Sequence, residues 1–493
     1  PRRARRDRLR FSGDSGQMKK EEQLSRQLEM NFSGRSKGNL FREHLANAEF
    51  SVLLELHIPG RDSKLESVVS KYSELESVAM APRNFPGGLA FLDDSPDFPS
   101  LDPGEFAAAL CKTGRDRHLI YLNGRDRSQE DIDYNLGIYR FEGFKNIAAV
   151  SGAAGSALED AVKHRYYDSV NILQRNACSK EPLFAGCVAN PFKYTRMDSI
   201  LQYSKLNKKI VAGAQFVVAQ SGWDMRKLLE MRWCMFRRSQ NIPTLARILY
   251  LSPEKAEDIC SGKCPGLWIS DDLKRAIRKE MMYSLAQFEA AQWRRLQIHA
   301  AGAKSLGYSG IQIAGADDPE TANRIYLRIQ EAMSEFSNYD DWRAAHNDYY
   351  SKVEMAPYPY RYYLFENMLA EGVTCDTAKV NSEPLPECSF AERFRYRLAR
   401  FLLPHADRMP AEDKRLTKRL LSACHRNCDN CHLPQTMYVC TGNCPKLLNN
   451  GVCGESRPSG DCPYTDTECV FAALLRRAEL DNDYSVLDEN VIR

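Results

Sequence analysis

Short apolar runs alternate with longer amphipathic stretches from Phe50 to about Phe336, which is more than half of the 493-residue chain. The runs are rich in Val, Ile, Leu, Ala and Phe and lack polar alternation, as is typical of parallel strands covered on both faces. They predict strands over Ser51–Ile58, Ser77–Ala81, His118–Asn123, Asn146–Ser151, Leu183–Ala189, Phe216–Gln220, Thr244–Leu251 and Gly310–Gly315. The amphipathic stretches predict helices over Ser63–Leu75, Pro103–Cys111, Gln129–Glu142, Tyr166–Asn176, Met197–Leu206 and Asp224–Arg237, a helical pair within Asp271–Leu306, and a final helix over Asp318–Phe336.

Strands and helices that alternate in this way predict an α/β protein, and eight such units predict a (β/α)8 TIM barrel. The alternative is an open doubly wound sheet, which more often carries a glycine-rich phosphate-binding turn after its first strand. Here the segment from Glu55 to Pro59 stands at that place, without a GxGxxG pattern. The barrel is therefore the favoured fold.

The chain divides into five predicted segments. A basic tail and helix cover residues 1–45, the barrel 46–336, a helical connector 337–421, a cysteine-rich metal-binding module 422–480 and a C-terminal tail 481–493. The connector is rich in tyrosine and contains an arginine-rich helix pattern over Phe390–Leu403. Tyrosines can stack on single-stranded nucleic acid, but packing onto the barrel is favoured because the net charge is only +3. We therefore expect no nucleic-acid partner.

Eight of the sixteen cysteines lie in one stretch of 46 residues near the C-terminus. They are Cys424, Cys428, Cys431, Cys440, Cys444, Cys453, Cys462 and Cys469. Turn residues surround them and aliphatic side chains are few, so another interaction must offset the conformational entropy lost on folding. Thiolate–metal bonds do so, and eight thiolates suit two four-cysteine sites, either iron–sulfur clusters or tetrahedral zinc.

Disulfide bonds are the alternative for an even number of cysteines in a small module. Single cysteines within apolar stretches, such as Cys111, Cys187 and Cys234, indicate a reducing compartment and so favour metal. The spacing does not separate iron–sulfur from zinc, because His425 or His432 can replace a cysteine at a zinc site.

Hydrophobic residues make up 43% of the chain and charged residues 27%, as in ordinary globular proteins, and no apolar run is long enough to span a membrane. Six arginines fall within the first ten residues. A solvated tail is favoured there over a nucleic-acid-binding arm or the remnant of an organelle transit peptide. We expect a cytoplasmic protein, with the mitochondrial matrix as the alternative.

Short words in the module and in the barrel are shared with a known family. In the module they are Cys428-x-x-Cys431, Tyr438-Val439-Cys440, Asn443-Cys444-Pro445-Lys446, Asn450-Gly451-x-Cys453-Gly454 and Cys469-Val470. In the barrel they are Leu54-Glu55-x-x-x-Pro59, Gly124-Arg125-Asp126-Arg127, Asn146-Ile147-x-Ala149-Val150-Ser151-Gly152, Tyr166-Tyr167-Asp168-Ser169, Asn190-Pro191, Lys208-Lys209-x-x-Ala212-Gly213-Ala214 and Ala219-Gln220. In these words the barrel resembles the methylenetetrahydrofolate reductases, and the module resembles the cysteine-rich domain found with many bacterial members.

The resemblance implies that Glu55 is the acid that protonates the bridging nitrogen of a folate, so that its methylene group accepts hydride from reduced flavin. It also implies that Gln220 hydrogen-bonds the pterin ring. The alternatives are an ion pair between Glu55 and Arg125 or Lys209, and a Gln220 amide satisfied by the backbone. Because strands of a barrel end at one mouth, Glu55, Gly152 and Gln220 are expected to face the same site.

A flavin cofactor, FAD or FMN, is the second implication of the resemblance. The positions that match flavin contacts are Tyr121, Ser151, Gly152, Tyr166, Tyr167, Asp168, Lys208 and Lys209, with the two lysines beside the phosphate arm. Ordinary packing accounts equally for the tyrosines, and a solvated helix end for the lysines.

Three positions on the flavin face depart from the family pattern. Ala153 stands where an aspartate usually tunes the flavin, and Tyr121 stands where a histidine flanks it. Ala81 or Pro82 stands where a threonine follows the second strand. The implied folate site is therefore better supported than the implied hydride transfer.

Three hypotheses of function follow from the sequence. The first is flavin-dependent reduction of 5,10-methylenetetrahydrofolate to 5-methyltetrahydrofolate, with electrons passed from a donor protein through an iron–sulfur module. The second is a diverged folate-binding relative that serves as a subunit or adaptor of a larger one-carbon or redox complex. The third is a methyl-transfer partner whose module holds zinc.

Overall fold

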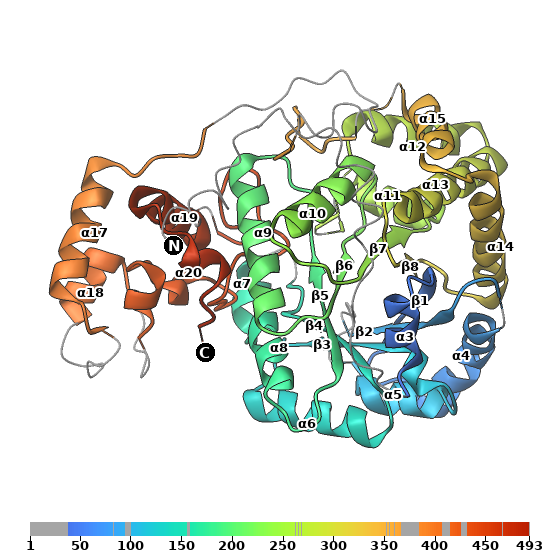
Figure 1. The fold of residues 1–493 in the computed structure, drawn as a ribbon, viewed down its shortest axis with the longest axis horizontal. Helices are drawn as coiled ribbons and strands as arrows, with labels where there is room; N and C mark the ends of the chain where they lie inside the picture. Colours follow the sequence, from blue (N-terminus) through green and yellow to red (C-terminus); the bar gives the residue numbers. More distant parts are fainter. Residues whose placement is uncertain are drawn as a thin grey trace.

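The computed structural model of the chain describes residues 38–492, apart from 82, 94–99, 155–157, 262, 265, 268, 352, 354, 359, 366–383, 407–414, 425–430 and 466. Eight parallel strands close into a barrel in sequence order, and β8 pairs with β1 (Figure 1). The strands are β1 Ser51–His57, β2 Gly87–Leu92, β3 Leu119–Asn123, β4 Asn146–Val150, β5 Phe184–Ala189, β6 Phe216–Ala219, β7 Thr244–Leu249 and β8 Gly310–Ala314. The (β/α)8 barrel expected from the sequence is confirmed.

Helices cover the outside of the barrel and build the C-terminal region. They are α3 Leu40–Ala46, α4 Leu65–Met80, α5 Pro103–Leu110, α6 Gln129–Phe141, α7 Leu158–Lys163, α8 Ser169–Ala177, α9 Arg196–Val211, α10 Met225–Arg237, α11 Pro253–Cys260, α12 Asp271–Tyr283, α13 Leu285–Ser305, α14 Pro319–Glu335, α15 Tyr339–Tyr350, α17 Phe390–Leu402, α18 Arg415–Ser422, α19 Val470–Asp481 and α20 Ser485–Asp488. Many begin at a capping side chain, for example Asp102, Ser128, Thr195 and Asp224. Among the helices of the described residues, none is long and apolar enough to cross a membrane.

Helix α3 closes the N-terminal end of the barrel. The ring of Phe41 meets Phe184 of β5 and Phe216 of β6 edge-on, with centroids 6.2 and 5.6 Å apart. Leu45 is fully buried beside it. Apolar side chains therefore fill this end of the interior, which leaves the C-terminal mouth for the polar side chains of the strands.

The second strand is where the prediction was wrong. Ser77–Ala81 was expected to form it, but α4 continues through this segment, and the strand is Gly87–Leu92. A Cβ at Gly87 would lie 2.2 Å from the carbonyl oxygen of Ala79, and one at Gly88 would lie 2.6 Å from that of Arg117. Glycine is thus required at both positions, because the backbone of β2 lies so close to these carbonyl oxygens. Two glycines also weaken the strand pattern in the sequence. The strand is followed by Asp93, rather than by Ala81 or Pro82; Pro82 lies outside the described residues.

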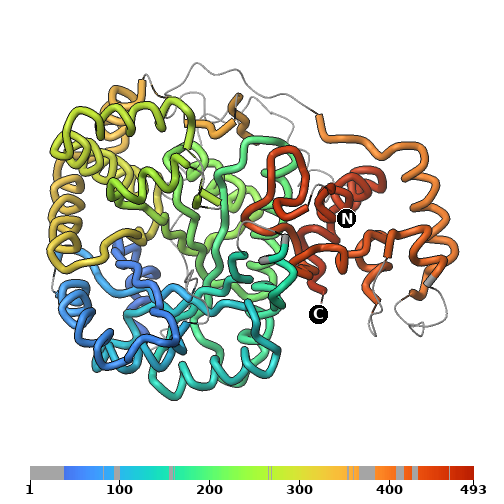
Figure 2. The backbone as a smooth tube through the Cα atoms, turned by 180° about the vertical axis from the view of Figure 1, so that it is seen from behind, coloured from blue at the N-terminus to red at the C-terminus, as the bar shows by residue number. Residues whose placement is uncertain are grey.

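The C-terminal region lies along one side of the barrel. Helices α19 and α20 pack against α9, and α17 packs on α18 beyond them (Figure 1, Figure 2). The cysteine-rich segment therefore lies between the barrel and the α17–α18 pair. The boundaries of the five predicted segments stay predictions.

Candidate functional site

Glu55 and Gln220, the two residues matched to folate contacts, are linked at the barrel mouth by Arg247 of β7. Two nitrogens of Arg247 bind the Glu55 carboxylate, and the Nη2–Oε2 distance is 2.6 Å. Its Nη1 donates to Gln220 Oε1 at 2.7 Å. The ion pair that the sequence left open with Arg125 or Lys209 is thus made with Arg247. Since Glu55 is only 2% exposed, the arginine takes the place of water around the carboxylate.

Gln312 and Tyr121 extend this network across the barrel interior. Gln312 Nε2 donates to Glu55 Oε1 at 2.7 Å, and the Tyr121 hydroxyl donates to Gln312 Oε1 at 2.8 Å. Strand register explains the meeting, because Gln312 pairs with Arg247 in β7 and with Leu53 in β1. Glu55 lies two residues after Leu53 in β1. Its side chain therefore points to the same face of the sheet as that of Leu53, which is the partner of Gln312. The mouth therefore presents a carboxylate, an arginine, two amides and a phenol in fixed positions.

Lys208 and Lys209 were matched to the phosphate arm of a flavin, and both ammonium groups are bonded within the protein. Lys208 Nζ donates to the carbonyl of Val486 in α20 at 2.7 Å. Lys209 Nζ donates to the carbonyl of Val188 in β5 at 2.6 Å. Burial lowers the pKa of each lysine to about 8. Lys208 thus joins α9 to the C-terminal region, and Lys209 joins α9 to β5 in the wall of the barrel.

Asp168 caps α8 and also binds the cysteine-rich segment. Its Oδ1 accepts a hydrogen bond from the first turn of α8 at 3.0 Å, and its Oδ2 accepts one from the Asn450 N–H at 3.2 Å. Burial alone would raise the pKa of Asp168, but the Lys205 ammonium 3.5 Å away and the backbone donors bring it below its usual value. Asn450 is fully buried, and its side chain bonds Asn171 of α8 and the backbone of Ile492.

Lys446 of the cysteine-rich segment lies at the end of β4. Its Nζ donates to the carbonyl of Gly152 at 2.6 Å and lies 4.8 Å from the centre of the Tyr166 ring. Burial would lower the pKa of Lys446, but the Glu455 carboxylate 3.3 Å away brings it above its usual value. The end of β4 and the Tyr166 ring are therefore covered by a cation of the C-terminal region.

Ser151 and Tyr167, the remaining positions matched to flavin, serve the local backbone. Ser151 Oγ accepts a hydrogen bond from the Ser169 N–H at 2.9 Å, and the Tyr167 N–H donates to the carbonyl of Gly124 at 2.8 Å. The matched positions from β4 to α9 are thus near one another, and most of their polar groups are bonded inside the chain. The buried Tyr166 hydroxyl is the exception, since it has no hydrogen-bond partner among the described residues. In this arrangement they do not fit a flavin.

Four cysteines of the C-terminal region lie close enough for a charge on one to act on the others. Burial raises the pKa of Cys444, Cys453 and Cys469, and neighbouring cysteines raise it further. The pKa of Cys469 reaches about 12. Cys462 belongs to the same set because it acts on Cys444 and Cys469. A metal that replaces the thiol protons with positive charge suits such a set.

The spacing of these sulfurs bears on the metal. Within the described part of the cysteine-rich segment, no three cysteines bring their sulfurs within 4.8 Å of one another. A single tetrahedral zinc holds its thiolates about 3.8 Å apart, whereas in a [4Fe–4S] cluster each thiolate binds its own iron and the sulfurs lie farther apart. Cys424 is partly buried, Cys431 and Cys440 are buried, and Cys428 lies outside the described residues.

Two family models match the sequence. The one described as methylenetetrahydrofolate reductase matches residues 110–281, and the one described as methylene-tetrahydrofolate reductase C terminal matches residues 403–492. The chain combines these two domains of methylenetetrahydrofolate reductases. The family resemblance stated from the sequence is confirmed by these matches.

Comparisons with individual proteins add little to the family assignment. No curated protein is significantly similar in sequence. A solved structure of an uncharacterised protein from Clostridium thermocellum, described as binding two copies of 5-methyl-5,6,7,8-tetrahydrofolic acid, is 13% identical, with a TM-score of 0.44 over 60% of this chain and 99% of that chain. One from Coccidioides immitis, described as a dihydrodipicolinate synthase family protein, is 12% identical, with a TM-score of 0.34 over 61% and 78%. These distant similarities carry no functional argument.

At two positions where the barrel departs from the family pattern, the structure shows what the residues bind. The carbonyl of Ala153, which stands in place of the usual aspartate, accepts a hydrogen bond from Arg125 Nη1 at 3.0 Å. Asp93 follows β2, is buried, and binds the Ser100 hydroxyl at 2.9 Å and the guanidinium of Arg127. The Asp93 carboxylate is therefore bonded to residues of the loops that follow β2 and β3.

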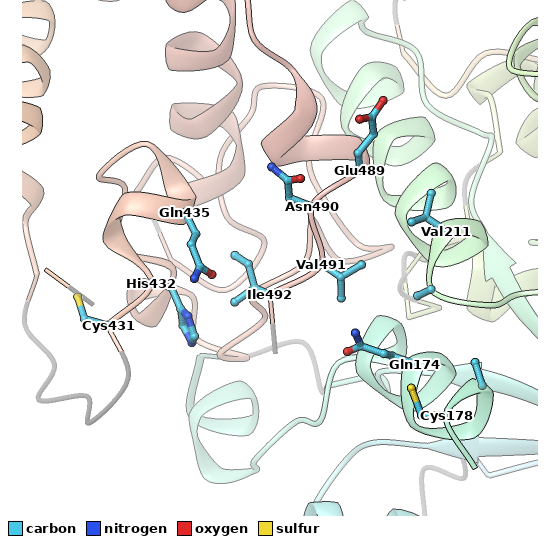
Figure 3. Close-up of a pocket in the computed structure, with 12 residues that line it drawn as sticks. Gln174, Cys178, Val211, Cys431, His432, Gln435, Glu489, Asn490, Val491 and Ile492 are labelled. Carbon is cyan, nitrogen blue, oxygen red and sulfur yellow. The ribbon is translucent and has the colours of Figure 1, made fainter. Parts of the chain in front are cut away.

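A separate cavity of about 950 Å³ opens between the barrel and the C-terminal domain (Figure 3). Cys178 and Gln174 line it from α8, and Cys431, His432 and Ile492 line it from the C-terminal domain. Its lining residues include no lysine or arginine, so it is poorly suited to phosphate groups. None of the mouth residues lines it, so the cavity and the barrel mouth are distinct places.

Glu76, Cys111 and His118 form the one group of three ligand-type side chains within 4.8 Å that the described residues contain. His118 is fully buried, which lowers its pKa to about 4. Its Nδ1 accepts a hydrogen bond from the Leu89 N–H at 3.0 Å, so the imidazole proton resides on Nε2. Nε2 therefore faces Glu76, 4.0 Å away, as a donor, which does not suit a metal ligand.

Three residues that shape these sites were not predicted from the sequence. Arg247 and Gln312 are polar residues in otherwise apolar strands, and this is the signal that could have found them. Lys446 was noted as part of a shared word, but its contact with Gly152 joins positions far apart in the sequence.

Proposed function

We propose that this chain is a folate-binding, electron-relaying subunit of a larger one-carbon redox complex, rather than a self-contained flavoenzyme. The observation that carries the proposal is the engagement of flavin-matched positions by the C-terminal domain. Lys208 is bonded to Val486, and Asp168 to Asn450. A flavin would have to displace buried contacts that hold the two domains together, at the cost of burying polar groups without partners.

The folate part of the proposal rests on the family and on the mouth of the barrel. Glu55, Gln220 and Arg247 lie together where barrel proteins bind their ligands. A pterin ring presents neighbouring N–H donors and a carbonyl acceptor, which suit a carboxylate and an amide in fixed positions. In this arrangement Glu55 accepts hydrogen bonds from Arg247 and Gln312, so it serves as an acceptor until a ligand displaces one of them.

The electron-relaying part rests on the cysteines. Cys444, Cys453, Cys462 and Cys469 would hold one iron–sulfur cluster, because they are buried and near enough for a charge on one to act on the others. The other four, Cys424, Cys428, Cys431 and Cys440, would hold a second. When bound, the clusters supply one-electron transfer to a protein that carries the hydride chemistry.

The proposal is tested by composition and turnover of the purified full chain. Protein purified without oxygen should contain iron in excess of zinc and should not quench the fluorescence of added FMN or FAD. It should bind 5-methyltetrahydrofolate, and Gln220→Ala should weaken this binding while Gln435→Ala, in the separate cavity, should not. Reduction of methylenetetrahydrofolate by the chain alone, with stoichiometric bound flavin, would overturn the subunit assignment and support the complete reductase.

A further inference from the structure

The helix pair α17–α18 lies at the end of the molecule farthest from the barrel (Figure 1, Figure 2). It exposes an unusual amount of apolar surface. Six large apolar side chains are exposed on these 21 residues, against eight on the rest of the described chain. They are Phe390, Phe394, Phe401 and Leu402 of α17, and Leu416 and Leu420 of α18. The three phenylalanines are 86%, 60% and 79% exposed. A patch of this kind on a folded protein marks a surface that binds something.

One face of α17 is fixed on the C-terminal domain. Tyr396 and Ala399 are buried, and Leu403 is fully buried just after the helix. The Tyr396 hydroxyl bonds Asp481 of α19, and its ring lies 6.2 Å from that of Tyr438. The helix is therefore held in place by its inner face, and its outer face is displayed by a folded support.

The outer face of α17 has a regular order of residues. At 100° per residue, Phe390, Phe394 and Phe401 lie within roughly 40° of one another around the helix. Ala391, Leu398 and Leu402 continue the apolar sector on one side. The sector is therefore more than roughly 100° wide, as in a helix that buries this face.

Arginines stand at the margins of this sector. Arg393, Arg397 and Arg400 lie along one edge, and Arg395 lies near the other. The two helices together hold seven basic residues and one acidic residue, a net charge of +6, whereas the whole chain carries +3. Positive charge is therefore concentrated at this end of the molecule.

We propose that the outer face of α17 and α18 binds the surface of an anionic membrane. A broad apolar sector with phenylalanine and leucine, bordered by arginines, is the arrangement of helices that lie in the membrane–water interface. Arginine stems can extend along the apolar region while their charged ends reach the phosphate groups of the lipids. The inference is independent of the proposed function.

Two other occupants fit the face less well. A second copy of this chain would bring two positively charged surfaces together, and like charges repel. A groove of another protein is generally filled by a few anchoring side chains at helical spacing, whereas here exposed apolar side chains lie on two helices. Both remain as outcomes of the test.

The test is co-sedimentation of the full chain with vesicles. Vesicles of phosphatidylcholine mixed with phosphatidylglycerol should bind the protein at low salt, and vesicles of phosphatidylcholine alone should bind it much less. Added salt should weaken binding because it screens the attraction to the anionic surface. The triple variant Phe390→Ser, Phe394→Ser, Phe401→Ser should lower the partition coefficient by about tenfold or more.

A matched variant removes the same number of exposed apolar side chains elsewhere. Phe141→Ser, Met282→Ser, Leu327→Ser should bind vesicles as the wild type does, because these residues are exposed on other helices. If the phenylalanine variant fails to fold by circular dichroism, Arg395→Gln, Arg397→Gln, Arg419→Gln tests the charged margin instead, with the same expected direction. The proposal is overturned if the phenylalanine variant, or the arginine variant used in its place, binds vesicles as well as the wild type does. It is also overturned if the wild type does not bind. Dimerisation that the triple variant abolishes, without vesicle binding, would assign the face to contacts between copies.

Discussion

Arg247 binds Glu55 through two nitrogens and Gln220 through a third, so one guanidinium connects β7 with β1 and with the residue that follows β6 at the mouth of the barrel. The Nη2–Oε2 distance is 2.6 Å, and the carboxylate side chain is 1% exposed against 17% for the arginine. A buried carboxylate held in this way depends on its partner, since no water can replace the lost contacts.

The first prediction concerns this pair. Arg247→Met should lower the free energy of unfolding by about 3–5 kcal/mol, because it leaves the Glu55 carboxylate buried without a cation. The double variant Glu55→Gln, Arg247→Met should recover part of the loss. Denaturant unfolding of the wild type, the single variants and the double variant measures the coupling. Arg294→Met is the control, since its pair with Glu335 is largely exposed and should cost less than about 1 kcal/mol. Equal losses at Arg247 and Arg294 would contradict the argument.

A second prediction uses two glycines. Gly152 has a φ of +97°, and a Cβ there would lie 2.3 Å from Asn123 Oδ1 and 2.8 Å from Arg125 Cβ. Gly152→Ala should therefore lower stability by about 1–3 kcal/mol. Gly137, within α6, has nothing within 4 Å of such an atom, so Gly137→Ala should raise stability by about 0.5–1 kcal/mol through helix propensity. Thermal unfolding compares them, and a shift of the same sign in both would be unexpected.

The third prediction concerns metal content. Cys444→Ser should remove one of two clusters and lower bound iron to about half, because a cluster needs all of its thiolates. Cys178→Ser is the matched control, since Cys178 is exposed on the barrel side and outside the cysteine set. Iron assay and visible absorbance of protein purified without oxygen measure the effect. Full iron in Cys444→Ser, or zinc without iron in the wild type, would refute the cluster assignment.

A fourth prediction concerns acid. Burial lowers the pKa of His118 and His346 to about 4, from 6.5 in the unfolded chain. Between these values the unfolded chain binds protons that the folded chain does not, so the free energy of unfolding falls as pH decreases from 6.5 to 4. Each histidine contributes up to about 3 kcal/mol. His346→Gln should flatten the slope in this window when unfolding is measured at several pH values, and a slope identical to that of the wild type would speak against a buried neutral His346.

The fifth prediction concerns domain docking. Asn450 is fully buried and its side chain bonds Asn171 and the backbone of Ile492, so Asn450→Ala should loosen the C-terminal domain from α8. Limited proteolysis should then release the C-terminal fragment several times faster. Asn443→Ala is the control, since the Asn443 amide makes an exposed bond within the C-terminal domain. Equal rates of cleavage in the two variants would show that the Asn450 side chain does not hold the C-terminal domain on α8.

Local patterns in the sequence were sufficient for seven of the eight strands. Continuous apolar runs and capping residues are properties of neighbouring positions, so Ser128 and Thr195 already mark helix starts. The prediction of the second strand was wrong because Gly87 and Gly88 are required by their close contacts with the backbone of Ala79 and Arg117. No local sequence pattern shows such contacts. Because β2 ends at Leu92, the residue that follows it is Asp93 and not Ala81.

The sequence by itself determined the barrel, the cysteine-rich tail and the family, because periodicity, composition and short motifs are written along the chain. Only the tertiary structure decided which partner each charged side chain takes. Lys208 meets Val486 across 278 positions, and Arg247 meets Glu55 across 192. Such pairings follow from how distant segments pack, and a buried charge bonds whichever group the packing brings within reach.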